Sequence, residues 1–295
     1  MHNSKWSYQR FLEAPMSLKK QKIKNKITKI LKTHRLIYWH LNKKFKKEVL
    51  SKKFESYLIP TRDTTIGKHL FINGDFDLNK LMKVNNLINL ENRTLIDVGA
   101  NLGSICIPAV RRKIVQNAIA IEPDKDTFVY LKKNISLNLV DNIKIINAIA
   151  GAEIGSAIFG SKSINPGDSK VVNKENIFEF QDSYPLPKIT LNSLFEDVKS
   201  EKFLIWIDAQ GYEPYILEGA SSFTSVLTPI VMEVFPLGIN QYSNFKHLEK
   251  SLSMYSYFAD LNYKTNKPKF ESIVKFKDVY SKLEISRSYS DFLFI

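Results

Sequence analysis

The chain has 295 residues and a formal net charge of +13, with 44% hydrophobic and 12% aromatic residues. This composition is typical of a globular protein with a full core and excludes a disordered chain. No window approaches 18 uninterrupted apolar residues, and no apolar stretch near the N-terminus leads to a small-residue cleavage site. We therefore expect neither a membrane span nor a signal peptide. The single cysteine, Cys106, cannot form an internal disulfide, which agrees with a cytoplasmic location.

The positive charge lies in an N-terminal arm. Residues 1–53 contain 16 Lys or Arg and only two acids, whereas the other 242 residues contain 27 basic and 28 acidic groups. Apolar residues recur in the arm every three or four positions, which predicts one long basic amphipathic helix, or two interrupted around His34. Such a helix can lie on an anionic membrane, dock on a partner, contact nucleic acid, or pack on the protein's own core. We predict an arm over 1–53 and a main domain over 54–295.

The main domain shows alternating strand and helix patterns. We expect strands at 66–72, 94–98, 118–121, 143–146, 203–207 and 230–234, and helices at 77–90, 102–113, 125–139 and 212–218. This alternation predicts a mainly parallel, doubly wound α/β sheet. Residues 151–188 interrupt it and are rich in Gly, Ser, Asn and Pro, so we predict a functional insertion there. A strand and a short helix at 189–198 then return to the core.

The sequence TLIDVGANLG, residues 94–103, predicts a ligand-binding turn after the first parallel strand. Gly99 permits a sharp turn, Gly103 permits close packing, and Asn101 is a candidate helix cap. The turn lacks the Gly-Lys-Ser/Thr of a phosphate loop, and Ala100 and Asn101 stand where a dinucleotide fingerprint requires glycine freedom. The carboxylate of Asp97 would repel a pyrophosphate but suits the ammonium and sulfonium of S-adenosylmethionine. The sulfonium cofactor therefore fits best.

Two further segments support a nucleoside site. The second strand ends in Glu122, 23 residues after Gly99, where a carboxylate can accept hydrogen bonds from both ribose hydroxyls. Pro123 fixes the exit turn, and after the third strand an adenine could lie against Ala148 and Ile149. A ribose-binding acid alone does not separate NAD from S-adenosylmethionine, so hydride transfer stays open as a weaker alternative.

Two acids follow the later strands. We expect Asp208 and Glu233 to face one another at the same sheet edge, because each ends a parallel strand. They are candidates for a general base and its partner, or for ligands of a divalent metal such as Mg²⁺. Glu213 is either functional or a helix N-terminal acid. His247 is an alternative base.

Six segments in this order resemble the FkbM-type methyltransferases. They are IDVGANLG, AIEPDKDTFVYLKKNISLN, IINAIAG, ITLNSL, IDAQGYEPYILEGA and VMEVFP, and the resemblance covers about residues 66–236. It implies a class I, Rossmann-like methyltransferase fold with a mostly parallel seven-stranded sheet and O-methylation of sugar or polyketide hydroxyls. In one departure, Gln210 replaces the first glutamate of the family's Asp-x-Glu-Gly-x-Glu block.

We therefore expect an S-adenosylmethionine-dependent O-methyltransferase acting on a saccharide or related metabolite. The acceptor could belong to a surface polysaccharide or its lipid-linked precursor, and the arm could hold the enzyme at an anionic membrane. In the insertion, Asn165, Asp168 and Ser169 are possible substrate contacts or simple turn residues. The alternatives are a nucleic-acid methyltransferase that uses the arm, and a non-catalytic partner in glycan assembly with a vestigial cofactor site. The near-neutral main domain counts against nucleic acid.

Overall fold

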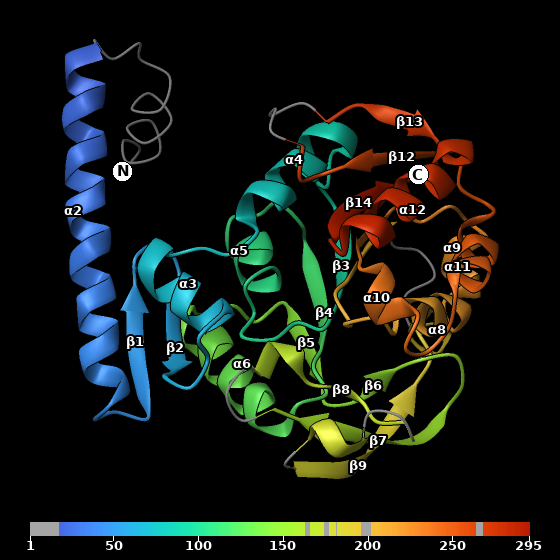
Figure 1. Ribbon diagram of the computed structural model, residues 1–295, viewed down its shortest axis with the longest axis horizontal. Helices are drawn as coiled ribbons and strands as arrows, with labels where there is room; N and C mark the ends of the chain where they lie inside the picture. The colour runs from blue at the N-terminus through green and yellow to red at the C-terminus, as the bar shows by residue number, and fades with distance from the viewer. Residues whose placement is uncertain (1–17, 163–165, 174–176, 181, 196–201, 264–267) are drawn as a thin grey trace.

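The N-terminal part of the described chain stands to one side of the molecule. The computed structural model describes residues 18–162, 166–173, 177–180, 182–195, 202–263 and 268–295. Helix α2 (Leu18–Lys43) leads through the antiparallel hairpin of β1 (Glu48–Lys52) and β2 (Ser56–Pro60) into the main body (Figure 1). The helix is continuous through His34, so the alternative of two helices is wrong. No helix within the described residues is long and apolar enough to cross a bilayer.

The main sheet has a doubly wound order, as predicted. In spatial order its strands are β13 (Phe270–Ser272), β12 (Tyr257–Asp260), β14 (Ser290–Phe294), β11 (Ile230–Val234), β10 (Lys202–Ile207), β3 (Arg93–Val98), β4 (Asn117–Ile121) and β5 (Ile143–Ile146). The five from β11 to β5 are parallel, and the other three pair antiparallel. The described sheet therefore has eight strands, and the predicted count of seven is wrong. The short edge strand β13 is exposed throughout and has no apolar alternation to reveal it.

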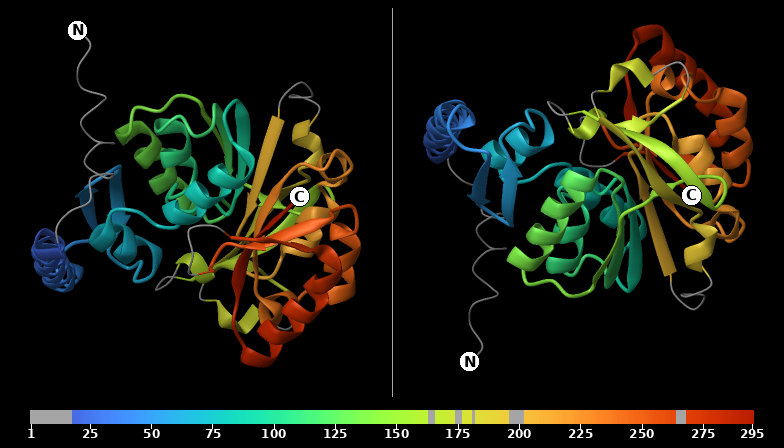
Figure 2. Two further views of the ribbon diagram at one scale, coloured as in Figure 1. Left: turned by 90° about the horizontal axis from the view of Figure 1, so that it is seen from above. Right: turned by 90° about the horizontal axis from the view of Figure 1, so that it is seen from below.

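Two hydrophobic cores lie on opposite faces of this sheet because successive strand residues point to opposite sides. Leu95 belongs to one core and its neighbour Ile96 to the other. The first core is covered by α3 (Ile66–Asn73), α4 (Leu78–Ile88), α5 (Cys106–Arg111) and α6 (Lys125–Leu137). The second is covered by α8 (Glu213–Glu218), α9 (Ser221–Thr224), α10 (Pro236–Ile239), α11 (Phe245–Leu252) and α12 (Phe276–Ser286). Figure 2 shows these two helical layers with the sheet between them.

Two predicted elements differ from the structure. The segment expected as a strand at 66–72 is helix α3, which ends at a left-handed Gly74 whose N–H donates to Leu70 O. A short apolar run does not distinguish a strand from a buried helix by periodicity alone. The helix expected at 102–113 is only Cys106–Arg111, because Asn101 and Gly103 adopt positive φ values of 50° and 85° and extend the preceding turn.

The insertion folds into a second, smaller sheet. Its order is β6 (Ile149–Ala150), β9 (Asp182–Ile189), β7 (Gly155–Ser161) and β8 (Lys170–Val171). β9 pairs within the insertion. The described part of the segment predicted to return to the core does so, because Leu191 and Leu194 are buried in the second core, and residues 196–198 lie outside the described residues. The short helix predicted after it is α7 (Asn192–Phe195). This small sheet packs beside the carboxyl ends of β4 and β5 (Figure 1).

Candidate functional site

A cavity opens where β3, β4 and β10 end, at the point where the strand order reverses. This is the position at which open α/β sheets bind ligands. Six of the nine residues predicted to bind the cofactor line it: Gly99, Asn101, Glu122, Pro123, Ala148 and Ile149. Asp208 and Gln210 line it too, whereas Asp97, Ala100, Gly103 and Glu233 are not among its lining residues.

The turn after β3 requires glycine at its first position. Gly99 has a φ of 83°, and a Cβ atom there would lie 2.0 Å from the carbonyl oxygen of Asp208. The main chain of β3 thus passes directly against the end of β10. The N–H groups of Gly99 and Ala100 both donate to Ile121 O, which ties the turn to β4 as well. The glycine predicted from the motif is needed for this close approach.

Glu122 is held by the main chain around the cavity. Its Oε2 accepts the Asn101 N–H at 2.8 Å and its Oε1 accepts the Asp124 N–H at 2.7 Å. Burial, followed by the nearby Asp124, raises the pKa of Glu122 to about 8. The side-chain amide of Asn147 donates to Glu122 O and Pro123 O, at 2.7 and 3.0 Å, and fixes this turn. The sequence reasoning did not identify Asn147, since a lone Asn after a strand has no distinctive pattern.

Asp97 and Asn101 have local contacts that differ from the predicted ones. Asp97 is 2% exposed, and its Oδ2 accepts the Cys106 N–H at the start of α5, at 3.2 Å. Burial raises the pKa of Asp97 to about 7. The Asn101 side chain accepts the N–H of Leu102 at 2.8 Å, four residues before Cys106, so the predicted cap on α5 is wrong. The carboxylate at that helix N-terminus belongs to Asp97 instead.

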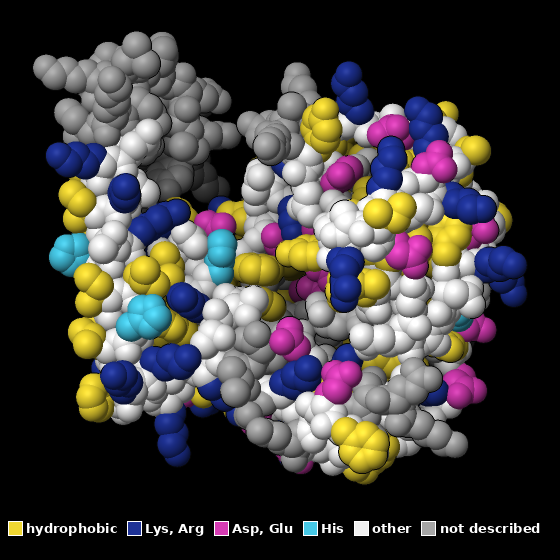
Figure 3. Space-filling view, viewed as in Figure 1, with side chains coloured by type: hydrophobic (Ala, Val, Ile, Leu, Met, Phe, Trp, Pro, Cys, Tyr) yellow, Lys and Arg dark blue, Asp and Glu magenta, His cyan; other side chains and the backbone are white. Residues whose placement is uncertain are grey.

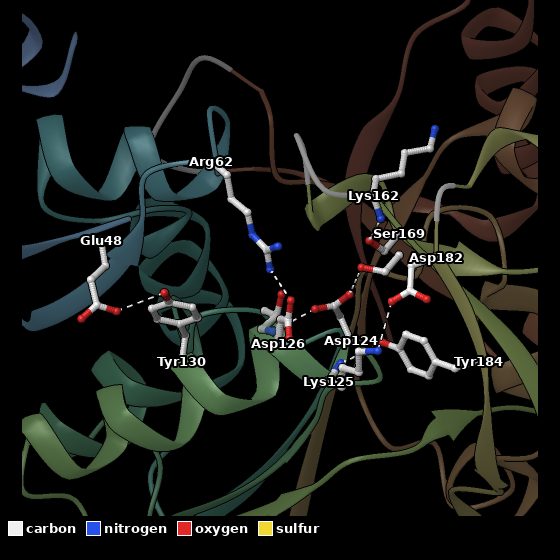
Figure 4. A network of polar contacts seen from close by, with 12 residues as sticks. Glu48, Arg62, Asp124, Lys125, Asp126, Tyr130, Lys162, Ser169, Asp182 and Tyr184 are labelled. Atoms are coloured by element: carbon white, nitrogen blue, oxygen red, sulfur yellow. Dashed lines mark hydrogen bonds and ion pairs between the residues drawn. The ribbon is translucent and has the colours of Figure 1, made fainter. Parts of the chain in front are cut away.

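The insertion forms one wall of the cavity and is attached to the N-terminus of α6 (Figure 4). Asp124 caps α6 by accepting the Thr127 N–H at 2.8 Å, and it also accepts the Ser161 hydroxyl at 2.5 Å. The Lys125 N–H donates to the Tyr184 hydroxyl at 2.9 Å, and Lys125 Nζ lies 3.0 Å from the Asp182 carboxylate. These contacts hold the β7–β9 sheet against the turn that carries Glu122.

Three insertion residues were predicted as possible substrate contacts. Ser169 lines the cavity, and its Oγ accepts the Lys162 N–H at 2.9 Å. Asp168 is not a lining residue, and Asn165 lies outside the described residues. Phe159 and Val171 also line the cavity, although no sequence pattern separated them from ordinary strand residues.

At the other end of the cavity, Gln210 joins the two predicted catalytic carboxylates. Its Nε2 donates to Asp208 Oδ1 at 2.9 Å and to Glu233 Oε2 at 3.5 Å. Gln210 has a φ of 54°, and the next residue, Gly211, has a φ of 104° and passes against the main chain of Gly238. The structure therefore brings Asp208 and Glu233 together, as expected, through the residue at which this chain departs from the family pattern.

Burial raises the pKa of both carboxyls. The pKa of Asp208 rises to about 6, mainly through burial. The pKa of Glu233 rises to about 10, through burial and then the nearby negative charges of Asp208 and Asp291. The additional negative charges around Glu233 thus raise its pKa further than that of Asp208.

An ion-pair cluster lies behind these carboxylates. Lys80 Nζ is 2.6 Å from Asp291 Oδ2 and 2.9 Å from Asp77 Oδ1. Asp291 lies opposite Glu233 in the β11–β14 register. Although burial disfavours its charge, the contacts with Asp291 and Asp77 raise the pKa of Lys80 above its usual value. The sequence reasoning missed Lys80 and Asp291 because α4 and β14 meet only in the folded chain.

Glu213 and His247 have structural partners. Glu213 Oε1 accepts the N–H groups of Ala209 and Gly211 at 3.0 and 3.2 Å, so Glu213 braces the turn before α8. Its Oε2 is buried without a hydrogen-bond partner, and burial raises the pKa of the group to about 7. His247 Nε2 lies 3.1 Å from Glu218 Oε2, and His247 is not a lining residue of the cavity.

The metal site predicted at Asp208 and Glu233 lacks support. Across the described ranges, no group of three or more His, Cys, Asp or Glu is arranged to hold a metal ion. The amide nitrogen of Gln210 donates to both carboxylates, and an N–H donor competes with a cation for the same oxygen lone pairs. The observed contacts are those of hydrogen-bonded acids.

Comparison with known proteins agrees with this site. The sequence profile of the methyltransferase FkbM domain matches residues 97–265. Among solved structures, the chain is similar to a methyltransferase FkbM from Methylobacillus flagellatus KT, with 13% identity, a TM-score of 0.45, and coverage of 77% of this chain and 52% of that one. It is also similar to M. jannaschii TYW2 in complex with AdoMet, with 14% identity, a TM-score of 0.37, and coverage of 77% and 88%.

A third similar structure is a precorrin-6y C5,15-methyltransferase from Geobacter metallireducens GS-15, with 10% identity, a TM-score of 0.39, and coverage of 73% and 86%. The chain spans about half the length of the M. flagellatus protein. No curated protein matches the sequence. The profile match covers more than half of the chain and includes the turn after β3, Glu122, Asp208 and Glu233. The chain therefore belongs to the FkbM methyltransferase family.

Proposed function

We propose that this protein is an S-adenosylmethionine-dependent methyltransferase that acts on a hydroxyl group of a saccharide or related metabolite, in the synthesis of a surface polysaccharide or its lipid-linked precursor. The observation that carries the proposal is the carboxyl of Asp208, which lines the cavity and is joined through Gln210 to the carboxyl of Glu233. A sugar hydroxyl is a poor nucleophile at neutral pH, so its methylation benefits from a positioned base more than methylation of an amine does.

The different surroundings of the two acids support different roles. With a pKa of about 6, Asp208 is mostly ionised at neutral pH and can accept the hydroxyl proton. Burial, followed by the negative charges of Asp208 and Asp291, raises the pKa of Glu233 further, so we expect Glu233 to be the protonated partner beside the base. The new bond joins the acceptor oxygen to the methyl carbon as the carbon–sulfur bond breaks, and the hydroxyl proton moves to Asp208. Alignment of the two reactants supplies much of the remaining acceleration.

The residues at the other end of the cavity fit the cofactor, which supplies an electrophilic methyl group when bound. A carboxylate has about four acceptor positions, and main-chain groups use two of those on Glu122. The remaining positions suit ribose hydroxyls. The small apolar side chains of Ala148 and Ile149 line the same cavity and suit an adenine ring.

Calorimetric titration with S-adenosylhomocysteine tests the cofactor end. We expect micromolar binding, weakened at least about tenfold by Glu122→Ala through loss of the hydrogen bonds that this side chain makes to the ribose hydroxyls. The matched control is Glu153→Ala, a carboxylate with a 78% exposed side chain, which should bind as the wild type does. A folded wild type that does not bind would contradict the assignment of the cavity and favour a vestigial site.

Methyl transfer to a panel of glycans tests the acceptor class. Labelled methyl groups should appear as ethers on sugar hydroxyls. Transfer only to RNA or DNA would contradict the proposal and support the nucleic-acid alternative. Because we assign the base role to Asp208 and not a metal-ligand role, turnover should survive EDTA unchanged. Loss of turnover in EDTA that Mg²⁺ restores would reverse this assignment.

We also propose that the enzyme works in the cytoplasm at the inner face of the membrane, where a lipid-linked acceptor would be found. The support is the surface of α2, whose contacts are described next.

A further inference from the structure

Among the described side chains of helix α2, Arg35, Tyr38 and Trp39 contact Phe71, and the Tyr38 ring stacks on it with the centroids 5.7 Å apart. The Arg35 guanidinium lies 4.6 Å from the centre of the Phe71 ring and donates to Ser51 Oγ at 2.9 Å. The Trp39 ring is 1% exposed, with its centroid 5.5 Å from that of Phe71. Arg35 and Trp39 are four residues apart and therefore lie on one side of the helix. This side attaches α2 to α3 and to the β1–β2 hairpin.

A row of aliphatic residues lies on a different side of α2. We call Ile27, Ile30, Leu31, Ile37 and Leu41 the α2 stripe. Each is between 47% and 59% exposed. At about 100° per residue, the stripe is centred roughly 130° around the helix from the Arg35–Trp39 face. The stripe therefore does not pack on the protein's own described core, which was one of the interpretations of the sequence. Figure 3 shows apolar side chains interspersed with Lys and Arg along this side of the molecule.

The surface around the stripe carries only positive charge. Residues 25–47 contain eight Lys or Arg and no Asp or Glu. At the end of α2 a groove runs between residues 43–47 and α6, and six cations line it: Lys43, Lys44, Lys46, Lys47, Arg62 and Lys133. The one acid among its lining residues, Asp126, is paired with Arg62 at 2.8 Å. Phe45, which is 84% exposed, lies in this groove and connects it to the stripe.

The exposed stripe and the basic groove together select a partner that is both apolar and anionic. Because Arg35 faces α3, seven exposed lysines of residues 25–47 remain, and a second copy would bring seven cations against seven cations, which disfavours a dimer through this surface. A nucleic acid would neutralise the lysines but would leave the aliphatic stripe uncovered. An anionic bilayer offers acyl chains to the stripe and phosphate groups to the lysines, as for other interfacial amphipathic helices.

We propose that the α2 stripe and the adjoining basic groove bind the surface of a bilayer that contains anionic lipids. In this arrangement the aliphatic side chains enter the boundary between headgroups and acyl chains, and the lysines contact lipid phosphates. The membrane location proposed above would then depend on this surface. It uses no residue of the cofactor cavity, so membrane binding and methyl transfer can succeed or fail separately.

Vesicle co-sedimentation of the full chain tests the proposal. We expect binding to vesicles of equal parts phosphatidylglycerol and phosphatidylcholine, and much weaker binding to phosphatidylcholine alone or at high salt. The double variant Ile30→Gln, Leu41→Gln should bind at least about tenfold more weakly because it removes apolar burial. The triple variant Lys43→Gln, Lys44→Gln, Lys46→Gln should bind about a hundredfold more weakly. All these positions are exposed, so the variants should fold.

Matched controls lie on the opposite side of the molecule. Val274→Gln, Ile285→Gln replaces two aliphatic residues that are each 83% exposed, and Lys246→Gln, Lys250→Gln, Lys277→Gln removes three exposed lysines. Both controls should bind vesicles as the wild type does. If the controls and the α2 variants lose vesicle binding equally, the proposal is overturned, because net charge or non-specific hydrophobic adsorption would then explain binding.

Sedimentation velocity provides a second arm. We expect a monomer whose mass is unchanged by the stripe variant. A wild-type dimer that Ile30→Gln, Leu41→Gln converts to a monomer would show that a second copy covers the stripe, and would contradict the membrane proposal. Titration of each variant with S-adenosylhomocysteine separates this outcome from failure of the proposed catalytic function.

Discussion

The two ends of the cavity are built by different means. At the β3–β4 end, main-chain N–H groups of Asn101 and Asp124 hold the Glu122 carboxylate, and the main chain at Gly99 lies against β10. These contacts depend on the local path of the backbone. We therefore expect substitutions at Glu122 or Gly99 to disturb this end more than substitutions at neighbouring side chains.

At the β10–β11 end, contacts between side chains hold the two acids in place. The amide of Gln210 bridges Asp208 and Glu233, and the Lys80–Asp291 ion pair lies behind them. A single substitution can therefore alter this end without moving the backbone. The cofactor end is therefore fixed by main-chain geometry, whereas single side-chain substitutions can change the contacts at the acceptor end.

The largest effect should follow removal of the proposed base. Asp208→Asn keeps the shape of the side chain but cannot accept the hydroxyl proton, so turnover should fall by about a hundredfold to a thousandfold. Affinity for S-adenosylhomocysteine should stay within about threefold, because the Glu122 end is intact. Steady-state kinetics and calorimetry measure the two quantities, with the exposed Asp278→Asn as the control. A loss of turnover below about tenfold would remove Asp208 from the chemistry.

The next effect tests the main-chain end. Gly99→Ala places a Cβ atom 2.0 Å from Asp208 O at a φ of 83°. Relief of this overlap must move β3 or β10, so the free energy of unfolding should fall by about 2 kcal/mol or more, measured by urea titration. Gly155→Ala is the matched control, because no atom lies within 4 Å of its added Cβ. Equal urea midpoints for both variants would mean that the turn is not constrained by β10.

The same contrast explains what could be predicted from the sequence. The turn after β3 is encoded in ten consecutive residues, and Glu122 follows at the spacing of one strand–helix–strand unit, so both were found by pattern. The parallel strands were found because each is a short apolar run between helical patterns. The motif position of Asp97 did not predict that its Oδ2 accepts the Cys106 N–H, and its contact with a cofactor stays a prediction.

Contacts between distant segments could not be predicted in this way. Lys80 comes from α4 and Asp291 from β14, and neither stands in a local pattern that marks it. The exposed edge strand β13 has no apolar face, and α3 resembles a strand in composition. Asp208 and Glu233 were found because each stands at the carboxyl end of a predicted parallel strand. Their bridge through Gln210 depends on the positive φ of Gln210, which the sequence does not reveal.

A third effect concerns stability against pH. Burial raises the pKa of Asp97, Glu122 and Glu213 to about 7, 8 and 7. The folded state therefore keeps protons that the unfolded chain releases near its ordinary carboxyl values. The stability from these groups is present at acidic pH and is lost as pH rises through about 7 to 8. We expect the free energy of unfolding to fall by more than about 1.4 kcal/mol, the equivalent of one pKa unit, between about pH 5.5 and 8.5.

Urea titrations across this range measure the slope. Glu122→Gln removes one of the three titrating groups and should flatten the profile, whereas Glu153→Gln, at an exposed position, should leave its shape unchanged. A stability that instead rises with pH would show that these carboxyls are ionised in the folded protein. The N–H groups of Asn101 and Asp124 would then stabilise the ionised Glu122 by more than burial disfavours it.

The smallest effect tests the side-chain end. Gln210→Glu restores the residue usual in the family block but replaces an amide donor by a carboxylate beside Asp208 and Glu233. Like charge and the lost N–H contact at 2.9 Å both disfavour ionised Asp208, so the acid limb of the pH dependence of kcat should move up by about half to one unit. Gln116→Glu, at an exposed position, is the control and should not shift it. If the pH dependence of kcat is the same for Gln210→Glu and the wild type, the amide of Gln210 does not set the pKa of Asp208. Burial and the Lys80–Asp291 ion pair would then determine the pKa of Asp208.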